Sequence, residues 1–144
     1  MKKLFYIFIL SSFLISCAED DPYSFSIDAK NGNDIERVVK FNISSKIVDS
    51  LKIERFWLIS IAKKAARYAD WGVKNELTYD FRNVDDALNM IYISDDRINV
   101  SVKGKADNSF GVSGKLTSIV AFDIETKEMI MDKNDLPEVV IIDF

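Results

Sequence analysis

The sequence contains no histidine and one cysteine, Cys17, and these absences remove several classes of chemistry. Ser-His-Asp and Cys-His catalysis need an imidazole to move the proton, and histidine-bearing zinc sites need it as a ligand. A single cysteine forms neither an intramolecular disulfide nor a cysteine-cluster metal site. We therefore expect no cofactor and no metal, and we predict that the chain is not an enzyme.

Glycine and proline are also scarce, with five and two residues in a chain of 144. With 48% hydrophobic and 29% charged residues, the composition is typical of a folded chain and excludes a disordered or repetitive one. The length suits one modest core. The 19 basic and 23 acidic residues give a net charge of -4, so we expect no nucleic-acid partner.

The N-terminus has the pattern of an export signal. Lys2 and Lys3 precede an apolar run from Leu4 to Ile15. This run is shorter than the roughly 20 residues that a transmembrane helix needs, and it has the proportions of a signal-peptide core. It ends in Leu14-Ile15-Ser16-Cys17, which resembles the lipobox of bacterial lipoproteins.

The resemblance implies that residues 1–16 are a cleaved signal peptide and that Cys17 carries the lipid. Residues 17–22 then form an acidic tether, and residues 23–144 form one domain. Ala18 follows the cysteine in place of the Asp that resembles an inner-membrane retention signal, so the outer membrane is favoured in a Gram-negative cell. Cleavage lowers the count of basic residues from 19 to 17, for a net charge of -6. An ordinary signal peptide followed by a free thiol is the alternative.

The first half of the domain predicts a hairpin and a helix. Alternation of apolar and polar residues over 23–29 and 39–44 predicts two strands, joined by a tight turn with positive φ at Asn31-Gly32. From Ile47 to Ala69 apolar residues recur at helical spacing. Residues 56–61 also fit a buried strand, but the helix formers that follow favour a helix. We expect Gly72 to interrupt or end this helix, and residues 73–77 to add a turn or two.

The second half predicts further strands. Residues 83–86 read as a connection, residues 90–93 and 98–102 as strands around an acidic turn at 94–96, and residues 116–124 as the clearest strand. Gly104, Gly111 and Gly114 indicate a wide turn between them. A hairpin arm at 128–131 and a last strand at 139–142 complete the set. The predicted fold is α+β, with a mostly antiparallel β-sheet packed against one main helix and an N-terminal β-hairpin.

Residues 102–124 resemble a pattern in small exported bacterial proteins, in which a strand enters an Asn-x-Phe-Gly turn and a second strand ends in an aromatic residue. Here the turn is Asn108-Ser109-Phe110-Gly111, and an upstream Trp57 and Val73-Lys74-Asn75-Glu76-Leu77 extend the likeness over about residues 57–124. The resemblance implies no activity. The residues themselves favour a turn in which Phe110 plugs the end of the sheet, against a binding role for the loop.

Few other residues are candidates for a site. Trp57, Tyr68 and Trp71 lie at helical spacing and form either part of the core or an aromatic face, the core being favoured. The loop that begins at Asp28, and the adjacent pairs Asp85-Asp86 and Asp95-Asp96, read as solvated turns rather than metal sites. As speculative binding residues we name Trp57, Trp71, Asn108 and Phe110.

Together these features predict a protein of the cell envelope, held in the membrane by lipid on Cys17, that binds an envelope protein. It would serve as an accessory subunit of an envelope assembly, or as an inhibitor, exclusion or immunity factor. The alternative is a periplasmic or surface domain that binds a small ligand or a peptide, with the aromatic residues and the Asn108 loop lining its pocket.

Overall fold

The computed structural model describes residues 21–82 and 89–143. The elements in chain order are β1 (Ser24–Lys30), β2 (Glu36–Ile43), the π-helix η1 (Lys46–Leu51), α1 (Arg55–Arg67), the 3₁₀ helix η2 (Glu76–Thr78), β3 (Asp80–Phe81), β4 (Asn89–Ser94), β5 (Arg97–Asp107), β6 (Ser113–Asp123) and β7 (Val139–Asp143). The expected connection at residues 83–86, with Asp85 and Asp86, lies outside the described residues.

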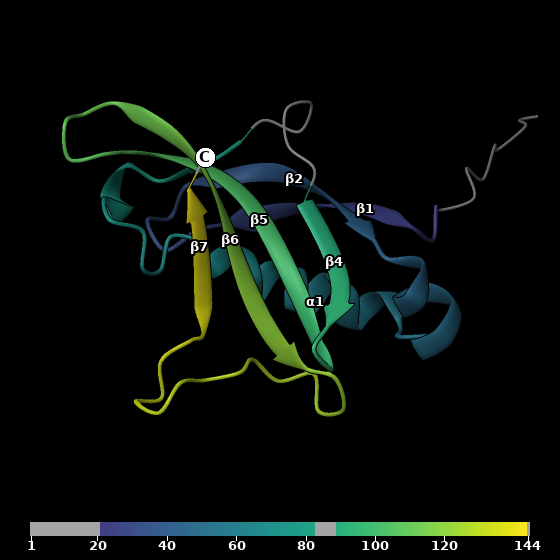
Figure 1. Cartoon of the computed structure of the whole chain (residues 1–144). Coiled ribbons are helices and arrows are strands. Elements are labelled where there is room, and N and C mark those ends of the chain that lie inside the picture. Colours follow the sequence, from purple (N-terminus) through teal and green to yellow (C-terminus); the bar gives the residue numbers. More distant parts are fainter. Residues whose placement is uncertain (1–20, 83–88, 144) are drawn as a thin grey trace, which may run out of the picture.

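The strands form one seven-stranded sheet in the order β1-β2-β4-β5-β6-β7, with the short β3 pairing with β5. All neighbours are antiparallel except β2 and β4, which are parallel because α1 lies in the connection between them. α1 packs on one face of the sheet and leaves the other face open (Figure 1). The predicted α+β fold is therefore confirmed.

The N-terminal hairpin is confirmed, with β1 and β2 paired from Ser24↔Asn42 to Lys30↔Glu36. The expectation of a tight turn with positive φ at Asn31-Gly32 is wrong in detail. The loop runs from Asn31 to Ile35, and the positive φ falls on Asp34, at 63°. Asn31 Oδ1 accepts the N–H groups of Asn33 and Ile35 at 3.0 and 2.9 Å, which fixes this geometry.

The helix is shorter than the sequence pattern suggests. Lys52 has a φ of 48°, and this left-handed residue separates the π-helix η1 from α1. Residues 56–61 belong to α1, so the helical alternative is the correct one. After α1 the chain turns through Gly72, whose φ of 80° is favourable only for glycine, and the expected further turn is η2.

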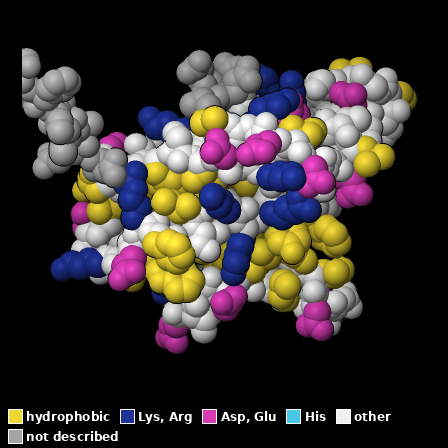
Figure 2. Space-filling view, turned by 180° about the vertical axis from the view of Figure 1, so that it is seen from behind, with side chains coloured by type: hydrophobic (Ala, Val, Ile, Leu, Met, Phe, Trp, Pro, Cys, Tyr) yellow, Lys and Arg dark blue, Asp and Glu magenta, His cyan; other side chains and the backbone are white. Residues whose placement is uncertain are grey.

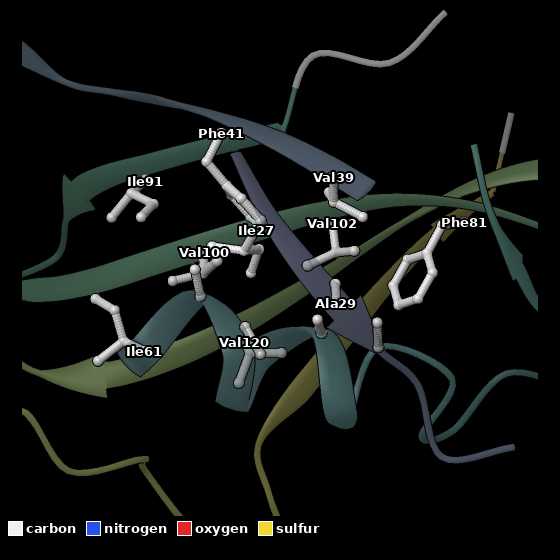
Figure 3. Close-up of a cluster of buried hydrophobic side chains, with 14 of the residues drawn as sticks. Ile27, Ala29, Val39, Phe41, Ile61, Phe81, Ile91, Val100, Val102 and Val120 are labelled. Atoms are coloured by element: carbon white, nitrogen blue, oxygen red, sulfur yellow. The ribbon is translucent and has the colours of Figure 1, made fainter. Parts of the chain in front are cut away.

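The core lies between α1 and the sheet (Figure 3). Alternate side chains of each strand point into it, as the period of two requires. Phe25 and Phe41 stack with their ring centroids 5.8 Å apart, and Phe41 is completely buried. α1 contributes a stripe of small and aliphatic residues, and alanines predominate at its C-terminal end: Leu58, Ile61, Ala62, Ala65 and Ala66. Small residues let the helix backbone approach the strands.

The longest pairing in the fold joins β5 and β6, over eleven residues of each strand. The expected strands at 98–102 and 116–124 are both part of it. Gly104, expected in the turn, lies inside β5, where it pairs with Leu116 and the buried ring of Tyr79 covers it. A Cβ at this position would be 2.2 Å from Tyr79 Cε2. Tyr79 also makes an edge contact with Phe81, with ring centroids 5.7 Å apart.

The last part of the chain is more irregular than expected. The arm predicted at 128–131 makes single bridges, Phe122↔Met129 and Met131↔Pro137, in place of a continuous strand. The acidic turn at Asp95 and Asp96 is confirmed, and both residues have positive φ. β7 matches the predicted last strand and forms one edge of the sheet.

Asp70, three residues beyond α1, is a buried carboxylate with 6% of its surface exposed. A Cβ on Gly32 would lie 2.6 Å from Asp70 Oδ2, so glycine is required there by close approach. Burial raises the pKa of Asp70 above its ordinary value, and the backbone N–H groups of Gly32 and Asn33 act in the opposite direction. Asp70 thus ties the end of the helix to the β1–β2 loop at an electrostatic cost.

We expect Asp70→Asn to gain stability relative to the wild type as the pH rises from about 4 to about 7. A folded-state pKa above the unfolded value of 3.8 gives a contribution that is fully present below 3.8 and is lost as the pH rises through the folded pKa. Asparagine does not titrate, and its amide oxygen still accepts hydrogen bonds. Urea unfolding at a series of pH values measures the difference.

Asp34→Asn is the matched control, because the pKa of Asp34 is shifted in the opposite direction from that of Asp70. Asp34 is exposed, and a hydrogen bond from Arg67, followed by one from Lys30, lowers its pKa. Its contribution is therefore present above 3.8 and is lost as the pH falls. If both variants follow the same pH slope relative to the wild type, the burial of Asp70 is not the source of the effect.

Candidate interaction surface

The β5–β6 hairpin ends in a loop that Asn108 holds in one conformation. Asn108 Oδ1 accepts the backbone N–H groups of Phe110 and Val112 at 2.9 and 3.0 Å. The Asn108 N–H donates to the Val112 carbonyl at 2.8 Å, and Gly111 has a φ of 75°. The amide oxygen is therefore used within the loop, and Asn108 positions its neighbours.

Two other loops have the same construction. Asn31 holds Ile35 and Asp132 holds Leu136 through equivalent hydrogen bonds, and the fourth residue has positive φ in each case. The middle residue is Asn33 in the first loop and Asn134 in the last, but Phe110 in the hairpin loop. Since polar residues occupy this position in the other two loops, the loop geometry does not require a phenylalanine.

Phe110 is 90% exposed, so the expectation that it plugs the end of the sheet is wrong. The loop of the β5–β6 hairpin projects beyond the rest of the sheet (Figure 1). Val112 is 61% exposed in the same loop. The N–H of Asp107, the last residue of β5, donates to Thr78 Oγ1 at 2.8 Å, which places η2 and its exposed Leu77 near the loop end of the hairpin. We call Leu77, Phe110 and Val112 the hairpin-end surface.

Sequence reasoning named Phe110 and missed Leu77 and Val112. Leu77 is an apolar residue between Glu76 and Thr78, and Val112 stands between Gly111 and Ser113. Isolated apolar residues in such polar surroundings carry a weak signal, because single exposed hydrophobic residues are common on protein surfaces. Their significance comes from the topology, which brings η2 and the β5–β6 hairpin to one end of the molecule.

A shallow cavity of about 360 Å³ lies beside this surface. Asn108 lines it, together with Val73, Asn75, Leu116 and Asp143. Neither tryptophan is part of the lining, so the arrangement expected for a ligand pocket, with aromatic residues and the Asn108 loop together, is not formed.

The two tryptophans lie at opposite ends of α1. Trp57 is in its first turn and Trp71 is four residues beyond its last residue, Arg67. Both are 41% exposed, so neither the favoured core position nor a common aromatic face is observed. Figure 2 views the helix-bearing side of the molecule, where hydrophobic side chains gather in two areas with Lys and Arg between them. The predicted aromatic face is thus divided between two ends.

The open face of the sheet carries a second hollow, of about 460 Å³. Tyr92, Asn99 and Ile119 lie in it. An ion pair between Arg97 and Glu138, with a distance of 2.9 Å, closes one end. The lining is mixed in polarity and open to solvent, which is typical of an uncovered sheet face rather than a built ligand site.

The described residues contain no group of three or more acidic or cysteine side chains placed to hold a metal ion. The exposed carboxylates are used locally: backbone N–H groups lower the pKa of Asp123 and Asp132 in their loops. Within residues 21–82 and 89–143, no helix has the length and apolar character that crossing a bilayer requires. Cys17 and the whole lipobox lie outside the described residues.

The chain has no match among protein-family models, curated proteins or solved structures.

Proposed function

We propose that this chain is a lipid-anchored protein of the bacterial cell envelope whose α+β domain is a non-enzymatic protein-interaction module. It would act as an accessory subunit of an envelope assembly, or as an inhibitor, exclusion or immunity factor. The observation that carries the proposal is Phe110, a 90% exposed aromatic side chain at the tip of a hairpin with a fixed loop conformation.

Phe110 has the properties of a binding anchor. A large aromatic side chain contributes much contact area, and aromatic side chains are enriched in the centres of protein interfaces. The hydrogen bonds that Asn108 Oδ1 accepts from the Phe110 and Val112 N–H groups stabilise the shape of the loop, which reduces the ordering cost of binding. Val112 is exposed in the same loop, and the exposed Leu77 lies in η2 near the loop end of the hairpin. A partner with an apolar pocket fits this surface.

The position of the surface suits an anchored protein. The first described residues and the β5–β6 hairpin lie at opposite ends of the molecule (Figure 1). A lipid on Cys17 would hold the first end at the membrane and direct the hairpin end away from it. Anchoring also raises the effective concentration of the domain toward a partner in the same membrane.

Crosslinking in the native host tests the proposal. We expect a photo-reactive amino acid at position 110 to capture one dominant envelope protein, identified by mass spectrometry. Position 134 is the matched control, because Asn134 occupies the same place in a loop of the same construction. Capture at 134 equal to that at 110, or no protein captured above background at 110, would overturn the assignment of this surface.

The alternative function, binding of a small ligand or a peptide, is favoured by the cavity of about 360 Å³ that Asn108 and Asp143 line. An experiment distinguishes this ligand-binding function from the protein-interaction function. A ligand in that cavity would shift the NMR signals of Val73 and Leu116 and leave position 110 without a protein crosslink.

A further inference from the structure

The end of the molecule opposite the hairpin carries its own exposed apolar cluster. Phe56 is 73% exposed and Trp57 41%, and their rings meet edge to face with centroids 6.0 Å apart. Leu51, at the end of η1, is 38% exposed. We call Leu51, Phe56 and Trp57 the chain-start surface.

Direct contacts tie this surface to the point where the described chain begins. Arg55 Nη1 donates to the Asp21 carbonyl at 3.1 Å, and Nη2 donates to the Ser24 carbonyl at 3.3 Å. The Tyr23 hydroxyl donates to Asp49 Oδ1, in η1, at 3.2 Å. Arg55 directly precedes Phe56 in α1. The start of β1, η1 and the first turn of α1 thus form one structural unit.

The length of the chain between the lipid and this unit is short. Four peptide units separate Cys17 from Asp21, and a fully extended chain spans at most about 3.6 Å per residue. Asp21 therefore lies within about 14 Å of the lipidated residue, in any conformation of the residues between them. A protein anchored at Cys17 cannot move this end far from the bilayer surface.

We propose that the chain-start surface rests on the lipid bilayer, with Phe56 and Trp57 inserted among the headgroups. This inference rests on the proposed lipid anchor. Tryptophan and phenylalanine on one side of a helix are suited to the membrane interface, where the ring meets the acyl boundary. Contact with lipid would remove from water the apolar area that the fold leaves exposed at this end.

The charges around the chain-start surface are mixed, so lipid contact there would depend on the burial of apolar side chains and not on attraction to anionic headgroups. Lys46 and Lys52 are exposed beside the cluster, but Asp49 and Glu54 are exposed there as well. The net charge of the mature chain is negative, so the surface gains little from an anionic membrane. The expected binding therefore depends weakly on salt.

The two tryptophans provide a matched experiment, since both are 41% exposed and they lie at opposite ends of α1. Full-length lipidated protein with Trp71→Phe retains Trp57 as its only tryptophan, and Trp57→Phe retains Trp71. Each is reconstituted in vesicles of phosphatidylethanolamine and phosphatidylglycerol that contain a lipid brominated near the headgroup. We expect at least twofold quenching and a blue shift for Trp57, and neither change for Trp71.

The outcomes of this experiment test the bilayer contact of the chain-start surface separately from the lipid anchor on Cys17. If the protein carries lipid and floats with the vesicles but Trp57 is not quenched, or if Trp71 is quenched equally, the chain-start surface does not rest on the bilayer. If the protein does not float, the proposed anchor itself fails. Circular dichroism verifies that each variant is folded. Phe56→Ser, in the Trp71→Phe protein, should reduce the quenching of Trp57 without altering flotation.

Discussion

Replacing Gly104 with alanine should lower the free energy of unfolding by about 2 kcal/mol, with overpacking as the cause. The added Cβ would stand 2.2 Å from Tyr79 Cε2 and 2.6 Å from its hydroxyl oxygen. Tyr79 is completely buried and packs against Phe81, so its ring has no free space in which to move. Either the ring or the β5 backbone must shift. Urea unfolding measured by circular dichroism gives the value.

Gly114→Ala is the matched control in the same hairpin. Gly114 pairs with Ala106 across the β5–β6 ladder, and a Cβ there would meet its nearest atom at 3.9 Å, an ordinary contact. We expect no loss of stability from this change. The double variant Gly104→Ala, Tyr79→Leu should lose less than the two single variants combined, because the smaller side chain removes the clash. Equal losses at 104 and 114 would contradict the packing described for Tyr79.

Much of the fold could be predicted because local pattern and tertiary environment agree. The alternation in β1, β2 and residues 98–102 of β5 matches one buried face, which a period of two specifies directly. β6 was predicted from its run of β-forming residues, and it is buried on both faces over most of its length. The helix formers after residue 61 resolved an ambiguous segment in favour of α1. The parallel pairing of β2 with β4 was not predicted, since it depends on the path of the helix between them and not on either strand.

The glycines show where local reasoning fails. Both Gly32 and Gly104 are expected in turns; Gly32 does lie in the β1–β2 loop, whereas Gly104 lies inside β5. Each is needed because a distant side chain, Asp70 or Tyr79, approaches its backbone. The positive φ that Gly32 was expected to supply falls on Asp34 instead. A sequence does not display such contacts, because the partners are 25 and 38 residues apart.

The candidate surfaces were predicted only in part for the same reason. Trp57 and Trp71 fit one helix face by spacing, but the helix ends at Arg67 and leaves Trp71 in the turn beyond it. Phe110 was placed correctly in a turn, but its 90% exposure contradicts the expectation that it plugs the end of the sheet. Leu51 and Phe56 belong to the apolar repeat from which the helix face is predicted, but both are exposed, so this part of the expectation is wrong. The interest of Phe56 comes from its place beside the start of the chain.

Cys17→Ala should move the protein from the membrane fraction to the soluble fraction almost completely. Two or three acyl chains hold a protein stably in a bilayer, whereas a few interfacial side chains alone do not. We expect the membrane-bound share to fall at least about tenfold, with Leu51, Phe56 and Trp57 too small an area to retain it. Fractionation of cells of the native host, followed by immunoblotting, measures the change.

Ala18→Ser is the control for this substitution, because it alters the neighbouring residue and leaves the cysteine in place. We expect it to remain in the membrane fraction. If Cys17→Ala also remains there, the anchor does not depend on this cysteine, and the orientation proposed for both ends of the molecule fails with it.

The most direct test of the central claim is the intact mass of the mature protein extracted from membranes of its host. The account predicts a chain that begins at Cys17, with a diacylglyceryl group on the thiol and an acyl chain on the new amino terminus. A chain that retains residues 1–16, or one that begins near Cys17 with an unmodified thiol, would contradict it.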